Sequence, residues 1–117
     1  MLCINAALTI SRFKPDVQQA HFALWRPVVK QLLTSLATRP DRSIVFLLWG
    51  GVARETFKKL GILEAAQDAG TANRVAIVTH VHPGAEANGH PRFFDPPNPF
   101  TSAQARLTAA GGPSIQW

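Results

Sequence analysis

Residues 43–49 read S-I-V-F-L-L-W and are followed directly by Gly50 and Gly51. The run is apolar throughout, without the alternation of a strand that has one face in water. It therefore predicts a strand of a parallel sheet that is covered on both faces. Two other short apolar runs bounded by turn-forming residues have the same character. The three predicted strands are Leu2–Leu8, Ser43–Trp49 and Arg74–Thr79.

The sequence between the first two predicted strands has the periodicity of a helix. Apolar residues recur at helical spacing between Trp25 and Leu36, with Pro27 near the expected first turn and Arg39-Pro40 marking the end. Two more helices are predicted from glycine and capping signals. They are a helix from Gly50 to about Leu60 that ends at Gly61, and a helix from Thr101 to Ala110 that Thr101 or Ser102 caps and Gly111-Gly112-Pro113 stops.

The order of elements predicts an α/β fold, a parallel sheet flanked by helices, in one domain over residues 1–117. Three strands are few for such a sheet, and the first begins almost at Met1. We therefore expect an incomplete sheet. Either another chain covers its edge, or the sequence is the C-terminal part of a larger domain that lacks an N-terminal segment here.

Composition narrows the classes of function. With 46% hydrophobic and 16% charged residues the chain is globular, and its net charge of +5 favours polyanionic partners such as nucleic acid, although a solvated mixed surface explains scattered charges equally well. The single cysteine, Cys3, fits a reducing compartment and offers no metal-ligand spacing. No apolar run reaches the roughly 18–20 residues of a membrane helix. We expect a cytoplasmic protein with no metal site and no membrane partner.

Polar or glycine residues follow each predicted strand. Asn5 lies in the first, Gly50 and Gly51 follow the second, and His80 and His82 follow the third. Ligands bind beyond the carboxyl ends of strands in open parallel sheets, so these features predict a site at one edge. Each also has a purely structural explanation: an amide that caps a strand end, a tight strand-to-helix turn, or a loop histidine bonded to a carbonyl.

Several motifs resemble one family. In order, the chain contains I-N-A-A-L-T, F-L-L-W-G, V-H-P-G, R-F-F and P-S-I-Q-W, which are similar to patterns in the C-terminal half of family 1 uracil-DNA glycosylases. That family has an α/β fold with a central parallel sheet. The resemblance covers nearly the whole chain and implies hydrolysis of the N-glycosidic bond of deoxyuridine in DNA, in base excision repair, without a cofactor.

The resemblance also implies roles for particular residues. Asn5 matches the asparagine that binds the edge of the flipped uracil, whose carbonyl and N–H one amide can pair with at once. His82 matches the catalytic histidine beside uracil O2, where negative charge develops as the bond breaks. Backbone contacts with DNA are implied for four residues: Gly50, Gly51, Pro83 and Gly84.

The departures from the family pattern concern catalysis. The G-Q-D-P-Y-H segment, with the aspartate that directs water, is absent from the sequence, as is the phenylalanine that stacks on uracil. Gly51 and Gly84 stand where the family has serines, and Glu86 stands where it inserts a leucine into the base stack. A carboxylate there opposes base extrusion near phosphates.

Two functions remain open at this point. The first is a uracil-DNA glycosylase-like enzyme of which this chain supplies the base-recognition half, with weak or no activity by itself. The second is a truncated or decayed glycosylase-like domain that binds DNA or a protein without catalysis.

Overall fold

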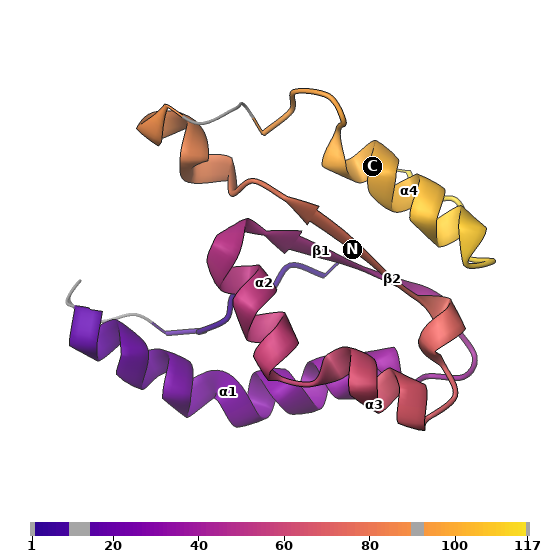
Figure 1. Cartoon of the computed structure of the whole chain (residues 1–117), viewed down its shortest axis with the longest axis horizontal. Helices are drawn as coiled ribbons and strands as arrows, with labels where there is room; N and C mark the ends of the chain where they lie inside the picture. Colours follow the sequence, from indigo (N-terminus) through magenta and orange to yellow (C-terminus); the bar gives the residue numbers. More distant parts are fainter. Residues whose placement is uncertain (1, 10–14, 90–92, 117) are drawn as a thin grey trace.

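The computed structural model describes residues 2–9, 15–89 and 93–116. Helices flank a two-stranded parallel sheet (Figure 1). In chain order the elements are α1 (Pro15–Ala37), β1 (Ile44–Trp49), α2 (Gly50–Lys59), α3 (Ile62–Asp68), the 3-10 turn η1 (Ala72–Arg74), β2 (Val75–His80), the 3-10 helix η2 (Pro83–Asn88) and α4 (Pro99–Ala109). The α/β class and the parallel sheet flanked by helices are as predicted.

The sheet pairs β1 with β2 in parallel, from Ile44 opposite Val75 to Trp49 opposite His80. One side of the sheet faces α1, α2 and α3, and the other side faces α4 (Figure 1). Phe46 of β1 points toward the three-helix side and packs on Phe57 of α2 with ring centroids 4.9 Å apart. The buried core on this side is Val29, Ala37, Phe46, Phe57, Leu60, Ile62 and Ala66.

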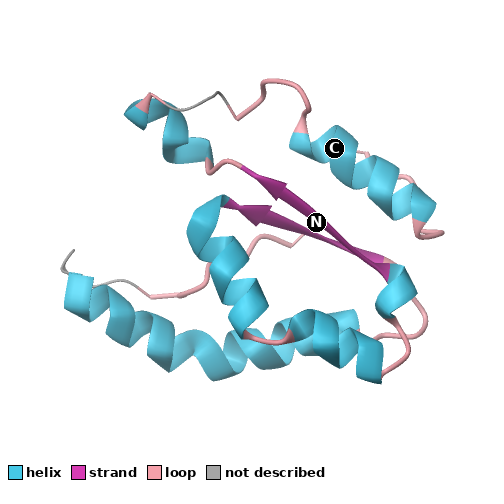
Figure 2. Cartoon of the chain, viewed as in Figure 1, coloured by secondary structure: helices cyan, strands magenta, loops and turns pink. Residues whose placement is uncertain are grey.

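The predicted strand Leu2–Leu8 is wrong, because residues 2–9 are irregular in the structure (Figure 2). Residues 2–6 nevertheless lie beside the sheet, since they and β1 line the same cavity. A strand, however, needs a hydrogen-bonded neighbour. No backbone hydrogen bond joins residues 2–9 to β1 in the described part of the chain.

The first helix is longer than predicted. It begins at Pro15, so that Pro27 lies in its interior and not in its first turn. An interior proline removes the hydrogen bond to the carbonyl four residues earlier, here that of Ala23. Ala23 and Leu24 are exposed, and water can reach that carbonyl.

The capping residues are defined at two further helix boundaries, the end of α2 and the start of α4. Leu60 is the C-cap of α2 and Gly61 follows it with φ +68°, as predicted, but Gly61 also starts α3, which the sequence analysis did not predict. Asn98 caps α4, and Thr101 and Ser102 do not. The Asn98 Oδ1 accepts from the backbone N–H groups of Phe100 (2.9 Å) and Thr101 (3.4 Å), and Pro99 takes the first helical position, which suits proline.

Candidate functional site

The carboxyl ends of the two strands lie side by side. Because Trp49 is opposite His80, the loops after β1 and β2 begin at the same edge of the sheet. The first continues as Gly50 and Gly51 into α2, and the second leads through His82 into η2. The predicted meeting of the glycine turn and the histidine loop is therefore present.

A backbone hydrogen bond selects the tautomer of the exposed His82 ring. The N–H of Gly84 donates to His82 Nδ1 over 3.0 Å. A nitrogen that accepts a hydrogen bond carries no proton, so the neutral ring keeps its proton on Nε2. Gly84 makes this approach possible, since a Cβ there would lie only 3.3 Å from Nδ1. The neutral His82 ring thus presents Nε2–H as its donor.

Gly50 packs directly against the same histidine. A Cβ on Gly50 would lie 3.1 Å from the Cβ of His82, and the residue has φ +81°, a conformation that suits glycine. Gly51, by contrast, has open space where a Cβ would be. Gly50 therefore positions the histidine loop, whereas Gly51 leaves the start of α2 uncovered.

Gly50→Ala should lower the free energy of unfolding by about 1–3 kcal/mol, because it adds backbone strain and a close contact with His82. Urea denaturation of both proteins measures this difference. Gly51→Ala is the matched control, and its expected effect is near zero or slightly stabilising, because alanine favours helix. Equal effects of the two substitutions would show that Gly50 has no special role.

The N-terminus of α2 presents hydrogen-bond donors at this edge. No side chain caps the helix, and its first turn contains no acidic residue. The first N–H groups of a helix have no partner within the helix and favour anions. The start of α2, next to His82, thus has the chemistry for a phosphate, as the resemblance implied for Gly50 and Gly51.

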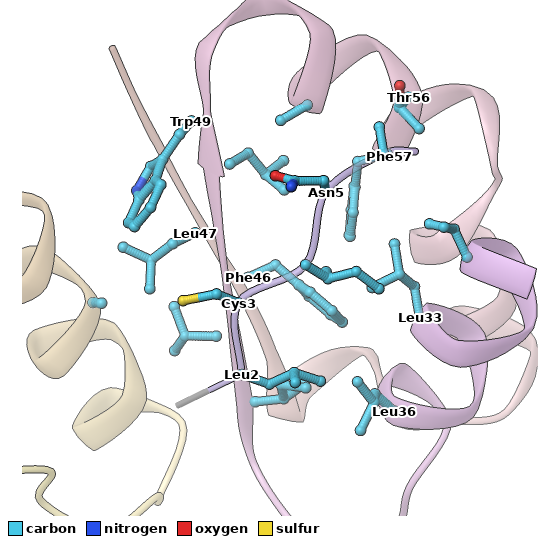
Figure 3. A pocket seen from close by; sticks show the side chains of 18 of the residues that line it. Leu2, Cys3, Asn5, Leu33, Leu36, Phe46, Leu47, Trp49, Thr56 and Phe57 are labelled. Atoms are coloured by element: carbon cyan, nitrogen blue, oxygen red, sulfur yellow. The ribbon is translucent and has the colours of Figure 1, made fainter. Parts of the chain in front are cut away.

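Asn5 lies on the other side of β1 from β2. It is exposed and lines a cavity together with Trp49, Ala53 and Phe57 (Figure 3). His82 does not line that cavity. The structure thus brings His82 together with Gly50 and Gly84, while a cleft shared by His82 and Asn5 stays a prediction.

His80 has a structural role that the sequence predicted only as a strand-end residue. Its Nε2 lies 2.6 Å from the carbonyl oxygen of Phe93, and the two rings are in edge contact. Phe93 also contacts Trp49 and Phe100 edge to face, with centroids 5.1 and 6.2 Å away. The sequence analysis missed this cluster, although R-F-F and N-P-F mark its members. It anchors the chain that follows η2 on the strand ends.

Other features of the described residues add no site. Pro83 is exposed at the start of η2, which also contains Glu86. Asp41, whose pKa is lowered by the hydrogen bond from Arg39, lies before β1 at the opposite end of the sheet. Within residues 2–9, 15–89 and 93–116, no group of three His, Cys, Asp or Glu side chains could hold a metal ion. Among the helices described, none combines the length and apolarity needed to cross a membrane.

Comparison with curated proteins shows which proteins the chain is similar to. The chain is 30% identical over all 117 residues to a uracil-DNA glycosylase of Streptococcus thermophilus, and 27% identical to those of Lactococcus lactis subsp. lactis and subsp. cremoris. It covers 47% of each, so it spans about half the length of the curated relatives it matches. No family model matches the chain, and no solved structure does. The resemblance to uracil-DNA glycosylases is confirmed along the whole chain.

Proposed function

We propose that this chain is the uracil-recognising part of a uracil-DNA glycosylase, which hydrolyses the N-glycosidic bond of deoxyuridine in DNA. The observation that carries the proposal is the tautomer of His82 at the carboxyl edge of a parallel sheet. Its Nδ1 accepts from Gly84, so that Nε2–H is the donor. The homology to uracil-DNA glycosylases supplies the reaction class.

His82 would stabilise the leaving group. As the glycosidic bond breaks, its electron pair moves onto the uracil ring and negative charge develops on O2. A fixed Nε2–H donor at that oxygen lowers the barrier, because its orientation is established before the charge appears. The hydrogen bond from Gly84 and the packing on Gly50 hold the ring in that orientation.

Asn5 would select the base, and the start of α2 would bind the DNA backbone. A side-chain amide offers one acceptor and two donors, which complement the N–H and carbonyl of uracil. Backbone N–H groups at Gly50 and Gly51, with Pro83 and Gly84 across the edge, would contact phosphate. The partner is uracil-containing DNA. We place the protein in the cytoplasm.

A uracil-release assay on a single-stranded oligonucleotide with one deoxyuridine tests the proposal. Release that disappears in His82→Ala supports it. Release that is the same in both proteins would show that the reaction occurs elsewhere or in a contaminant.

Binding to DNA should weaken steeply with salt. The net charge of +5 and the uncapped start of α2 favour a small number of phosphate contacts. Two or three such contacts predict a loss of about 10- to 50-fold in affinity between 50 and 200 mM salt, because binding releases counterions from DNA and this release is less favourable at higher salt. Fluorescence anisotropy with a labelled oligonucleotide at the two salt concentrations measures the loss. If the chain does not bind DNA even at low salt, its net positive charge is only a property of its surface and does not serve DNA binding.

A non-catalytic domain is the second candidate function. The observation that favours it is Glu86, which stands at the position of an inserting leucine. Such a domain would still bind DNA with salt dependence but would release no uracil. The release assay distinguishes the two functions.

A further inference from the structure

The ring of Phe94 is exposed, although its neighbour in the chain is packed. Phe94 is 66% exposed, whereas Phe93 is 5% exposed. A single exposed apolar side chain is common on protein surfaces and indicates no function by itself. A binding role for Phe94 therefore has to rest on how the ring is held and on where it lies.

Two other rings hold the ring of Phe94. It meets Phe93 edge to face with centroids 5.1 Å apart, and it lies nearly parallel to Phe100 of α4, with an interplanar angle of 28° and centroids 6.4 Å apart. Phe93 and Phe100 also contact each other, with centroids 6.2 Å apart. We call Phe93, Phe94 and Phe100 the aromatic platform. Because its supports restrict the exposed ring, little conformational entropy is lost when a flat ligand stacks on it.

The aromatic platform is joined to the carboxyl ends of both strands. Phe93 packs on Trp49, the last residue of β1, with centroids 5.1 Å apart, and its carbonyl oxygen lies 2.6 Å from Nε2 of His80, the last residue of β2. The uncapped start of α2 follows Trp49 directly, and His82 follows His80 by two residues. Phe94 is therefore at the same edge of the sheet as the phosphate and leaving-group contacts proposed above.

A ligand for this edge needs both a flat apolar face and negative charge. The exposed ring offers a stacking surface, while the N–H groups at the start of α2 favour an anion and the chain has a net charge of +5. Every nucleotide of a nucleic-acid strand carries both groups, which an apolar peptide and a lipid do not. In a duplex each base is already stacked on its neighbours, so the ligand that a single exposed ring fits is an unpaired strand.

We propose that Phe94 stacks on a base of single-stranded DNA that flanks the deoxyuridine. The inference rests on the proposed function for its ligand, and it adds a contact outside the uracil, to which Asn5 and His82 are assigned. Stacking of a base on an aromatic side chain raises affinity by about 5- to 100-fold and depends little on which base it is. Phe94 is uncharged and Asp95 follows it directly, so this contact acts by stacking and not by attraction of phosphate.

Fluorescence anisotropy with a labelled oligothymidylate, which contains no deoxyuridine, tests the stacking apart from catalysis. Phe94→Ala should lower the affinity by about 5- to 100-fold without changing its salt dependence, because no phosphate contact is lost. Phe94→Leu should lose about as much, since leucine is apolar but has no flat ring, and Phe94→Trp should keep the affinity. Leu24→Ala is the matched control, because Leu24 is 67% exposed on α1, and it should leave the affinity unchanged.

An abasic scan locates the stacked base. One abasic site is moved along a single strand that contains one deoxyuridine, and the affinities of the unmodified chain and of Phe94→Ala are measured before uracil is released. At a position that flanks the deoxyuridine, the abasic site should weaken the unmodified chain by about 5- to 100-fold. It should weaken Phe94→Ala much less, because the base and the ring are the two partners of one interaction.

The outcomes separate this inference from the proposed function. Abasic losses that are equal in both chains at every position, or a Phe94→Leu variant that binds as tightly as the unmodified chain, would overturn the stacking, and uracil release that depends on His82 would still stand. Losses specific to the Phe94 ring without uracil release would support the stacking and contradict the proposed reaction. If the unmodified chain binds no single strand, both are wrong.

Discussion

His82→Ala is expected to abolish the uracil release that the 117-residue chain retains. The substitution removes the Nε2–H donor that the Gly84 amide fixes by binding Nδ1. Loss of one preorganised donor to a developing oxyanion costs about 10²–10³-fold in rate. Single-turnover release from a single-stranded oligonucleotide with one deoxyuridine measures it.

His82→Gln and His21→Gln are informative companions to this substitution. Glutamine keeps an N–H donor near the same place, so His82→Gln should retain more activity than His82→Ala. His21 lies on α1 and its Nδ1 is 2.8 Å from Thr9 Oγ1, so it belongs to neither of the loops that follow the strands, and His21→Gln should have no effect on release. If His21→Gln and His82→Ala slow release equally, the role given to the His82 ring is wrong.

The unmodified chain should itself be slow, by about 10²–10⁴-fold relative to efficient glycosylases, because it lacks the aspartate motif that directs water. It should also release uracil faster from single-stranded than from duplex DNA. Duplex DNA requires base extrusion, and Glu86 stands where the family pattern has an apolar wedge. Glu86→Leu should narrow the difference between the two substrates. Parallel assays on both substrates measure these rates.

Fast release by the unmodified chain would mean that another carboxylate directs water. Asp16, in the first turn of α1, and Asp95 are then the first residues to replace. Asp16→Asn or Asp95→Asn would identify it by a loss of rate without a loss of DNA binding.

The strands were predictable where a neighbour exists to pair with. The apolar run 43–49 became β1 and the run 74–79 became β2 with a shift of one residue, because each completes the other's hydrogen bonds. Residues 2–8 have equal apolar character but remain irregular. Periodicity reports which residues prefer burial, and it does not report whether a hydrogen-bonding partner is present.

Helix boundaries depended on local chemistry that the sequence shows only in part. Gly61 was interpreted correctly as the end of α2, but its left-handed conformation also turns the chain into α3. Pro27 suggested a helix start and instead lies inside α1, where the preceding residues are exposed. Asn98 before Pro99 was the better capping signal for α4, because it combines a capping amide with proline at the first position.

For the candidate site, topology was predictable and atomic detail was not. Parallel strands place their carboxyl ends at one edge, so the meeting of Gly50 with His82 follows from the order of elements. The tautomer of His82 depends on the position of the Gly84 amide, which no pattern of residue types reveals. The cavity between residues 2–6 and β1 was foreseen only as an incomplete sheet, since its walls come from segments far apart in sequence.

The central claim is that this chain carries the uracil-recognising and leaving-group chemistry of a glycosylase. Its most direct test is the ratio of single-turnover uracil release by the unmodified chain to that by His82→Ala, on the same single-stranded substrate. The account predicts slow release by the unmodified chain and a ratio of at least ~10². Equal release by the two proteins, or no release by either, would contradict it.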